Sequence, residues 1–278
     1  MNLSRRSLLA AAAAFPAMPS ALRGAQAGAA GDLKLGVATY SLRKLTFLEA
    51  VKAMQELQVR YAKLKLEVHL PYSSSPAQVR EAKKVLEDAG ITLVASGNTN
   101  LQKMDEGDIR QKFEFNKALG VGIMTCAPTA ETLPIVEKMV KEYDIKVAIH
   151  NHGPEDKHYP APSDALKQIA KMDPRMGVCM DAGHTSRTGI DIVKATRECG
   201  KRLYDVDVKD LKDAMVSRSQ CDVGDGVLPV AGLLKLLRNE MKYQHVVMLE
   251  YEINADNPIP GMHRSLQYMR GVLAGLKA

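Results

Sequence analysis

Four residues with metal-binding side chains, most of them hard oxygen ligands, recur through the second half of the chain. They are separated by 31, 26 and 43 residues, and they are His150, Asp181, Asp207 and Glu250. One imidazole and three carboxylates favour Mn²⁺, Mg²⁺, Co²⁺ or Zn²⁺ over copper or an iron–sulfur centre. Each residue alone is a weak signal, because an aspartate at the end of a strand often caps a helix. The four together predict one divalent metal site, provided that the fold brings the side chains together.

The segments that carry these residues alternate between strand-like and helix-like patterns. Short apolar runs predict eight strands at 33–39, 61–67, 91–96, 121–126, 145–151, 176–181, 203–208 and 245–250. Amphipathic stretches predict helices near 46–57, 76–89, 107–119, 129–142, 162–172, 189–199, 229–240 and 261–276. Eight such units in ~250 residues are typical of one (β/α)8 TIM barrel. An open doubly wound sheet is the alternative, but the turn after the first strand lacks the glycine-rich sequence of that fold.

Polar residues in five of the expected strands fall on one face, because they alternate with apolar residues. The strands at 61–67, 145–151, 176–181, 203–208 and 245–250 show this pattern. The apolar set is expected to face the helices and the polar set to face the barrel interior. Ionised groups inside a barrel are costly unless they are paired or bound to a metal. The pattern therefore predicts a functional site; an inert network in which Lys63, Lys65 and Lys209 neutralise the acids is the alternative.

Several other polar residues near strand ends are candidates for substrate binding. Lys65, Glu67 and His69 could hold substrate hydroxyls or form an ion pair at the rim. His152 could orient a metal ligand by a hydrogen bond without contacting the metal itself, or it could be an ordinary loop residue. Lys209 could contact a substrate oxygen or only neutralise the neighbouring aspartates. The sequence leaves these alternatives open.

The composition limits the class of protein. The chain has 278 residues, of which 46% are hydrophobic and 25% are charged, and its mean hydropathy is −0.18. These values exclude a polytopic membrane protein and a disordered chain. Trp is absent and aromatic residues make up 5% of the chain, which argues against an aromatic platform that binds nucleic acid or carbohydrate. The four cysteines form no Cys-x-x-Cys pair, so a disulfide framework and a zinc finger are not expected.

Residues 1–27 are predicted to be a signal peptide. Arg5 and Arg6 precede an apolar stretch, and Ala25-Gln26-Ala27 provides a cleavage site. The arginine pair is typical of a twin-arginine (Tat) signal, with a general secretory signal as the alternative. We expect a barrel domain at 28–278, export to the periplasm or beyond, and no stable membrane anchor, because the apolar stretch is short. Removal of the signal takes away three arginines and no acid, which lowers the net charge from +6 to +3 and gives little support for a nucleic-acid partner.

Five segments are similar to motifs of a known family. They lie at 147–153 (Val-Ala-Ile-His-Asn-His-Gly), 180–184 (Met-Asp-Ala-Gly-His), 206–210 (Val-Asp-Val-Lys-Asp), 224–226 (Gly-Asp-Gly) and 249–252 (Leu-Glu-Tyr-Glu). Through them residues 33–276 resemble the xylose isomerase-like TIM barrels, the sugar phosphate isomerase/epimerase family. The resemblance implies a divalent metal at the ends of strands five to eight, with Asp181 and Glu250 among its ligands. It also implies that His184 contacts the substrate.

Two positions depart from the family pattern. His150 stands where a glutamate is usual, and Asp207 stands where a histidine is usual. The ligand set remains one imidazole and three carboxylates, so we expect metal binding to be retained. The departure at position 150 leaves the catalytic base open, because the family's glutamate on strand five often removes the substrate proton. His150, because an imidazole can take up a proton near neutral pH, and Glu250 are the two candidates.

The resemblance and the four metal-binding residues together predict a sugar isomerase or epimerase. A divalent metal that bridges a carbonyl and a neighbouring hydroxyl acidifies the adjacent C–H, and a base removes the proton to give an enediolate. A lyase that eliminates a β-substituent from a 3-keto-glycoside would use the same site and is the alternative. Export favours a small sugar or glycoside without a phosphate as the substrate. The sequence leaves open whether the chain forms a homo-oligomer.

Three other functions fit the sequence less well. A metal-dependent endonuclease of the same superfamily would need a histidine-rich zinc site and a basic surface, but the chain has only seven histidines. A periplasmic binding protein would show two lobes joined by a hinge. A barrel that has lost its metal and its activity is the third, and the two departures from the family pattern favour it.

Overall fold

The computed structural model describes residues 32–277, and eight parallel strands in them form a closed barrel. The strands are β1 Lys34–Ala38, β2 Tyr61–Leu64, β3 Thr92–Leu101, β4 Ile123–Pro128, β5 Lys146–His150, β6 Met176–Asp181, β7 Leu203–Val208 and β10 Val246–Leu249. Neighbours along the chain lie side by side, and β10 closes the barrel against β1. The prediction of a (β/α)8 TIM barrel is therefore confirmed. The predicted signal at 1–27 lies outside the described residues.

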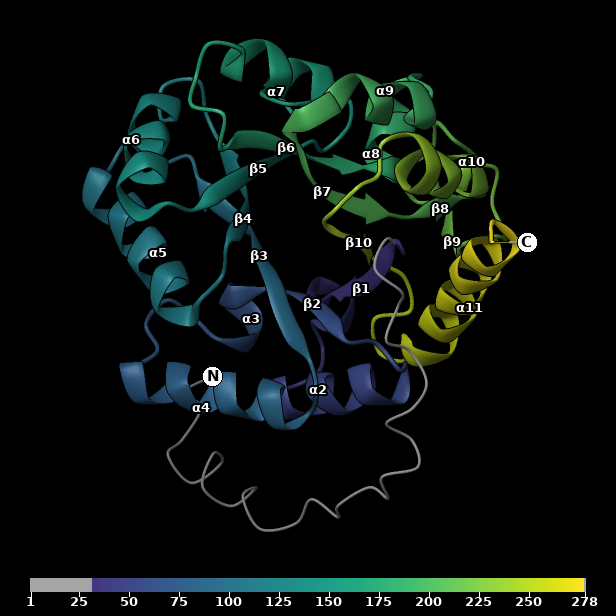
Figure 1. The fold of residues 1–278 in the computed structure, drawn as a ribbon, viewed down its shortest axis with the longest axis horizontal. Helices are drawn as coiled ribbons and strands as arrows, with labels where there is room; N and C mark the ends of the chain where they lie inside the picture. The colour runs from purple at the N-terminus through teal and green to yellow at the C-terminus, as the bar shows by residue number, and fades with distance from the viewer. Residues whose placement is uncertain (1–31, 278) are drawn as a thin grey trace. The chain divides into compact units, whose positions relative to one another are not determined.

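Helices follow the strands and surround them, as Figure 1 shows. The longer ones are α2 Phe47–Glu56, α4 Pro76–Asp88, α5 Glu106–Leu119, α6 Leu133–Tyr143, α7 Pro162–Ile169, α9 Ile192–Cys199, α10 Val230–Lys235 and α11 Ile259–Gly275. Helix α10 continues as a π-helical turn, Leu236–Glu240. The shorter elements are α3 Leu66–His69, α8 Ala182–Arg187, two 3₁₀ turns at Thr39–Leu42 and Gly200–Arg202, and a hairpin of β8 Asp210–Leu211 and β9 Gln220–Cys221. No helix among residues 32–277 is long and apolar enough to cross a membrane.

Local sequence explains where several helices begin and end. The Thr46 side chain accepts a hydrogen bond from the backbone N–H of Glu49, and the Glu49 carboxylate accepts one from the backbone N–H of Thr46. This capping box starts α2. Ser75 caps α4 in the same way, with Pro76 as its first residue. Gly120 ends α5 with a φ of 83°, a conformation that glycine adopts without steric cost.

Most strands lie within two residues of their predicted bounds, and two differ by more. The second was expected to run to Glu67, but β2 ends at Leu64 because the backbone N–H of Lys65 donates to the Thr39 hydroxyl (2.9 Å) and a helical turn follows. The third was expected to end at residue 96, but β3 continues to Leu101, where it pairs with the end of β4. Both differences arise from contacts between segments that are distant in sequence.

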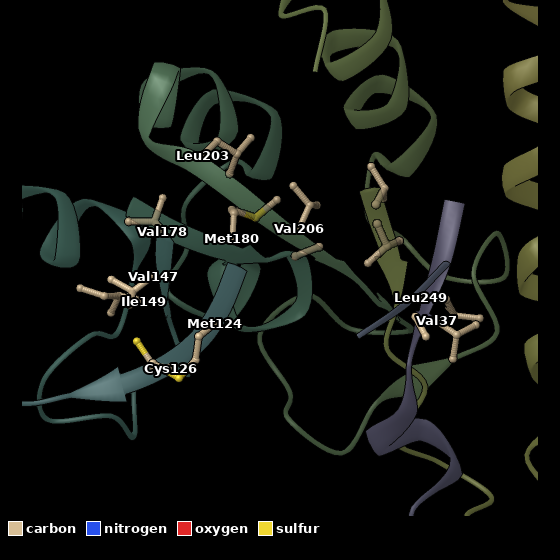
Figure 2. Packing of buried hydrophobic residues seen from close by; sticks show 14 of the residues in the cluster. Val37, Met124, Cys126, Val147, Ile149, Val178, Met180, Leu203, Val206 and Leu249 are labelled. Atoms are coloured by element: carbon tan, nitrogen blue, oxygen red, sulfur yellow. The ribbon is translucent and has the colours of Figure 1, made fainter. Parts of the chain in front are cut away.

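The apolar residues of the strands pack outward against the helices, as their alternation predicted. Val147, Ile149, Val178 and Met180 are fully buried in one large cluster with the helix faces, and Figure 2 shows their packing. The residues between them, including Cys179, belong to the opposite face of the sheet. Burying a side chain of this size contributes about 1.5–3 kcal/mol, so this layer supports the strands that carry the polar residues inside.

Candidate metal centre

Strand register brings the four predicted metal ligands together at the C-terminal end of the barrel. Asp181 is the last residue of β6 and lies directly opposite Asp207 of β7. His150 ends β5, and Glu250 follows β10, where its backbone N–H donates to Val208 of β7 (3.1 Å). Parallel strands end at the same edge of a barrel, which is where barrel enzymes carry their chemistry.

The four side chains form a compact buried cluster. Their candidate ligand atoms all lie within 4.8 Å of one another. Nε2 of His150 is 3.3 Å from Asp207 Oδ2, 3.8 Å from Asp181 Oδ2 and 3.9 Å from Glu250 Oε2. This nitrogen therefore faces all three carboxylates, as the nitrogen of a metal-binding imidazole would.

The polar groups of the cluster fit a divalent cation. Asp181 Oδ2 is a buried acceptor that receives no hydrogen bond, while Oδ1 accepts one from the backbone N–H of His184 (2.7 Å). Three carboxylates packed around one imidazole carry an excess of negative charge that burial makes costly. A hard divalent ion accepts such oxygen and nitrogen donors and would neutralise that charge.

The charges within the cluster shift the pKa values of His150 and Glu250 in opposite directions. Burial alone would lower the pKa of His150, but Asp207, Glu250 and Asp181 outweigh burial and raise the pKa to about 10. The opposite holds for Glu250, whose pKa is held well below its usual range because Lys209 and His150 outweigh the effect of burial. Without a metal, the imidazole is therefore protonated and Glu250 is ionised at neutral pH.

A second layer of charge lies beneath the cluster, inside the barrel. Lys63 of β2 is buried and reaches across to β7, where its ammonium lies 2.7 Å from Asp205 Oδ2 and 2.5 Å from Asp207. The Thr125 hydroxyl of β4 donates to Asp205 (2.7 Å), and the Cys179 thiol donates to Asp207 (3.3 Å). Asp207 is therefore held in place from below while its carboxylate faces His150.

Lys209 contacts the two carboxylates of the cluster that Lys63 does not. Its ammonium is 3.1 Å from Asp181 Oδ2, 3.1 Å from Glu250 Oε2 and 2.6 Å from Glu252 Oε2. The structure thus places Lys209 against Asp181 and Glu250, whereas Lys63 contacts Asp207. These contacts support one of the two roles considered for Lys209, which is to neutralise the acids.

Two histidines border the cluster. The His152 ring lies 4.4 Å from the His150 ring between centroids, and the His184 ring lies 5.4 Å from that of His152. The Asn98 amide N–H₂ donates to His152 Nε2 (3.2 Å), and His152 Nδ1 lies 3.3 Å from Asp156. Burial and the charge of His150 lower the pKa of His152 to about 4, so its ring is neutral at pH 7.

The strand-two candidates do not meet the cluster in this structure. Lys65 forms an ion pair with Glu67 (2.9 Å) and donates to the Asn98 carbonyl (2.6 Å). His69 is buried, and its ring contacts the Thr39 hydroxyl (3.1 Å) and the Leu42 carbonyl (3.4 Å). Since β2 ends at Leu64, the strand alternation that pointed Lys65 and Glu67 inward does not apply to them.

Sequence reasoning missed three residues beside the cluster. Two of them could have been found from their positions in the sequence. Glu252 lies two residues after Glu250, and Arg187 lies three residues after His184. Asn98 had no such signal, since the third strand was expected to end before it. Only the extension of β3 brings Asn98 to the C-terminal end of the barrel.

Known structures share this architecture. An uncharacterized protein from Parabacteroides distasonis has 26% sequence identity and a TM-score of 0.68, over 86% of this chain and 99% of its own. The IOLI protein with a bound zinc atom has 14% identity and a TM-score of 0.72, over 87% and 99%. The D-psicose 3-epimerase of Clostridium cellulolyticum H10 has 16% identity and a TM-score of 0.71, over 87% and 99%. No curated protein matches the sequence.

A family model gives the most direct assignment. The model described as "Xylose isomerase-like TIM barrel" matches residues 24–272, which is most of the chain. It agrees with the closed parallel barrel. The chain belongs to the xylose isomerase-like TIM barrel family.

Proposed function

We propose that the protein is a divalent-metal-dependent enzyme that isomerises or epimerises a sugar by removing a proton beside a carbonyl group. The observation that carries the proposal is the buried cluster of one imidazole and three carboxylates at the C-terminal end of the barrel. His150, Asp181, Asp207 and Glu250 would hold the ion. When bound, a divalent ion supplies Lewis-acid polarisation of a carbonyl oxygen.

Glu250 is the proposed base. Its carboxylate is ionised at neutral pH, and its position directly after β10 places it at the mouth of the barrel. His150 is the weaker candidate, because Nε2 points to the three carboxylates and Nδ1 is buried without a hydrogen-bond partner. Its role in this proposal is to hold the metal, with Lys209 keeping Glu250 charged until the substrate arrives.

The proposed substrate is a sugar or glycoside without a phosphate group. The cations nearest the cluster are already paired with carboxylates: Lys63 with two aspartates, Lys209 with Glu252, and Arg187 with Glu155. A phosphate needs a free cation or backbone donors, so these pairings favour a neutral substrate. The bordering residues His152, His184 and Asn98 offer donors and acceptors that suit hydroxyl groups.

Deuterium exchange tests the proposed reaction. The purified barrel with Mn²⁺ or Co²⁺ would be incubated in D₂O with a panel of keto-sugars and keto-glycosides, and products followed by NMR. We expect solvent deuterium at the carbon beside the carbonyl, together with a primary isotope effect on labelled substrate. Turnover without exchange and without that isotope effect would contradict proton abstraction, whereas loss of a substituent would identify a lyase.

We also propose that residues 1–27 direct export through the Tat system to the periplasm or the medium. The support is the Arg5-Arg6 pair before an apolar stretch and the small residues at 25–27. Replacement of both arginines by lysine is expected to block export while the general secretory route tolerates it. Unchanged export of the double variant would contradict a Tat signal.

A further inference from the structure

Arg187 is a buried arginine that ends helix α8 beside the metal cluster. Its side chain is 6% exposed, and Nη1 lies 2.5 and 2.7 Å from the two carboxylate oxygens of Glu155. Nη2 donates to the carbonyl of His152 (3.0 Å) and lies 2.8 Å from Nδ1 of His184. These four contacts fix the plane of the guanidinium.

The contact between Arg187 and His184 decides where the imidazole proton lies. A guanidinium has N–H donors and no acceptor, so His184 Nδ1 must accept the hydrogen bond with its lone pair. A neutral imidazole carries its one proton on the other nitrogen, and a protonated ring would place N–H against N–H. The proton of His184 is therefore on Nε2.

His184 Nε2 faces a second donor. Among residues 32–277 its one hydrogen-bond contact is with the ammonium of Lys209, at 3.4 Å, which is longer than the 2.8 Å contact between Nδ1 and Arg187. The same ammonium donates to Glu252 (2.6 Å) and lies 3.1 Å from both Asp181 and Glu250. The imidazole N–H and the ammonium thus converge without an acceptor between them. Two donors at this separation can both reach one oxygen that carries negative charge.

We propose that Arg187 is a positioning residue that holds His184 in the Nε2–H tautomer, so that His184 donates a hydrogen bond to a substrate oxygen and does not act as a base. The identity of that oxygen, the one that gains charge when the proton leaves, rests on the proposed function. The tautomer itself does not, because it follows from the contacts of Arg187 in the free protein.

The inference predicts what happens when Arg187 is lost. Without the guanidinium, Nδ1 has no donor facing it, while Nε2 still faces the Lys209 ammonium at 3.4 Å. The favourable tautomer then becomes Nδ1–H, with Nε2 accepting a hydrogen bond from Lys209. Removal of one residue should therefore exchange the donor and acceptor nitrogens of another.

Nitrogen NMR of the imidazole rings tests this directly, since protonated and unprotonated ring nitrogens resonate at well-separated ¹⁵N frequencies. The sample is the ¹⁵N-labelled barrel with Mg²⁺ or Zn²⁺, which are diamagnetic, and His184→Gln assigns the signals of His184. We expect Nε2–H in the wild type, Nδ1–H in Arg187→Leu, and Nε2–H in Arg187→Lys, which keeps a donor. Glu155→Gln is the matched control, because it weakens the ion pair of Arg187 and leaves Nη2 against His184; it should keep Nε2–H.

Two results would overturn the inference. One is the Nδ1–H tautomer in the wild-type protein, a measurement that does not depend on the folding of any variant. The other is the Nε2–H tautomer retained in a folded Arg187→Leu variant.

Kinetic measurements test the same inference. Arg187→Leu and His184→Gln should each slow deuterium exchange ~10²-fold, and the double variant should be no slower than His184→Gln alone. Independent, additive losses would show that Arg187 does not act through His184. Failure of the proposed function would abolish exchange in the wild type and leave the NMR result unchanged.

Discussion

Metal binding at the cluster should compete with the proton on His150. The imidazole has a pKa of about 10 in the metal-free cluster because Asp207, Glu250 and Asp181 surround it. A metal needs the neutral imidazole, so the proton must leave before Nε2 can serve as a ligand. Metal affinity is therefore expected to rise with pH, and each ion should release about one proton near neutral pH.

The size of the effect follows from the difference between that pKa and the working pH. At pH 7 only about one imidazole in 10³ is neutral, which lowers the affinity about 10³-fold, or about 4 kcal/mol. The Kd should fall about tenfold for each pH unit, which is about 100-fold between pH 6.5 and 8.5. Stability of the metal-free protein changes in the opposite sense. The imidazolium contributes fully below the unfolded-state pKa of ~6.5, and its contribution is lost as pH rises toward about 10.

Isothermal titration calorimetry with Mn²⁺ under anaerobic conditions measures both quantities. Titrations in buffers with different ionisation enthalpies give the number of protons released, and titrations across pH give the slope. Glu155→Gln provides a control, because Glu155 contacts Arg187 at the rim and should leave proton release unchanged. A Kd that does not vary with pH, with no proton release, would refute the reasoning.

Three further outcomes are expected. Asp181→Asn keeps the shape of a ligand and removes its charge, so it should lose metal and activity together; retention of both would count against the four-residue site. Lys63→Met leaves two buried carboxylates without their ammonium and should lower the free energy of unfolding by about 3–5 kcal/mol in urea titrations, and a loss below about 1 kcal/mol would contradict the role of this ion pair. Thr46→Ala removes the cap of α2 and should cost about 1 kcal/mol in the same assay, with unchanged stability as the contrary result.

The sequence predicted the barrel and the four clustered residues because both depend on local periodicity. Alternation within the strands that carry the four residues showed which side chains point inward, and a parallel barrel brings strand ends to one edge. His150 and Asp181 could therefore be grouped although 31 residues separate them.

The rest of the site depends on contacts that no local pattern encodes. Lys65 turns away because its backbone N–H bonds to Thr39, which lies 26 residues earlier. Asn98 reaches His152 because β3 extends along β4, and that pairing is tertiary. Arg187 lies on the short helix α8, where the sequence shows its distance from His184 but not the direction of its guanidinium.

Metal stoichiometry in two matched variants tests the central claim most directly. Asp205 and Asp207 lie on the same strand, are both buried inside the barrel, and both contact Lys63, but only Asp207 belongs to the four-residue cluster. Wild-type protein and folded Asp205→Asn should each bind one divalent ion per chain, measured by elemental analysis after dialysis, and Asp207→Asn should bind none. Equal metal content in the two variants, or none in the wild type, would contradict the account.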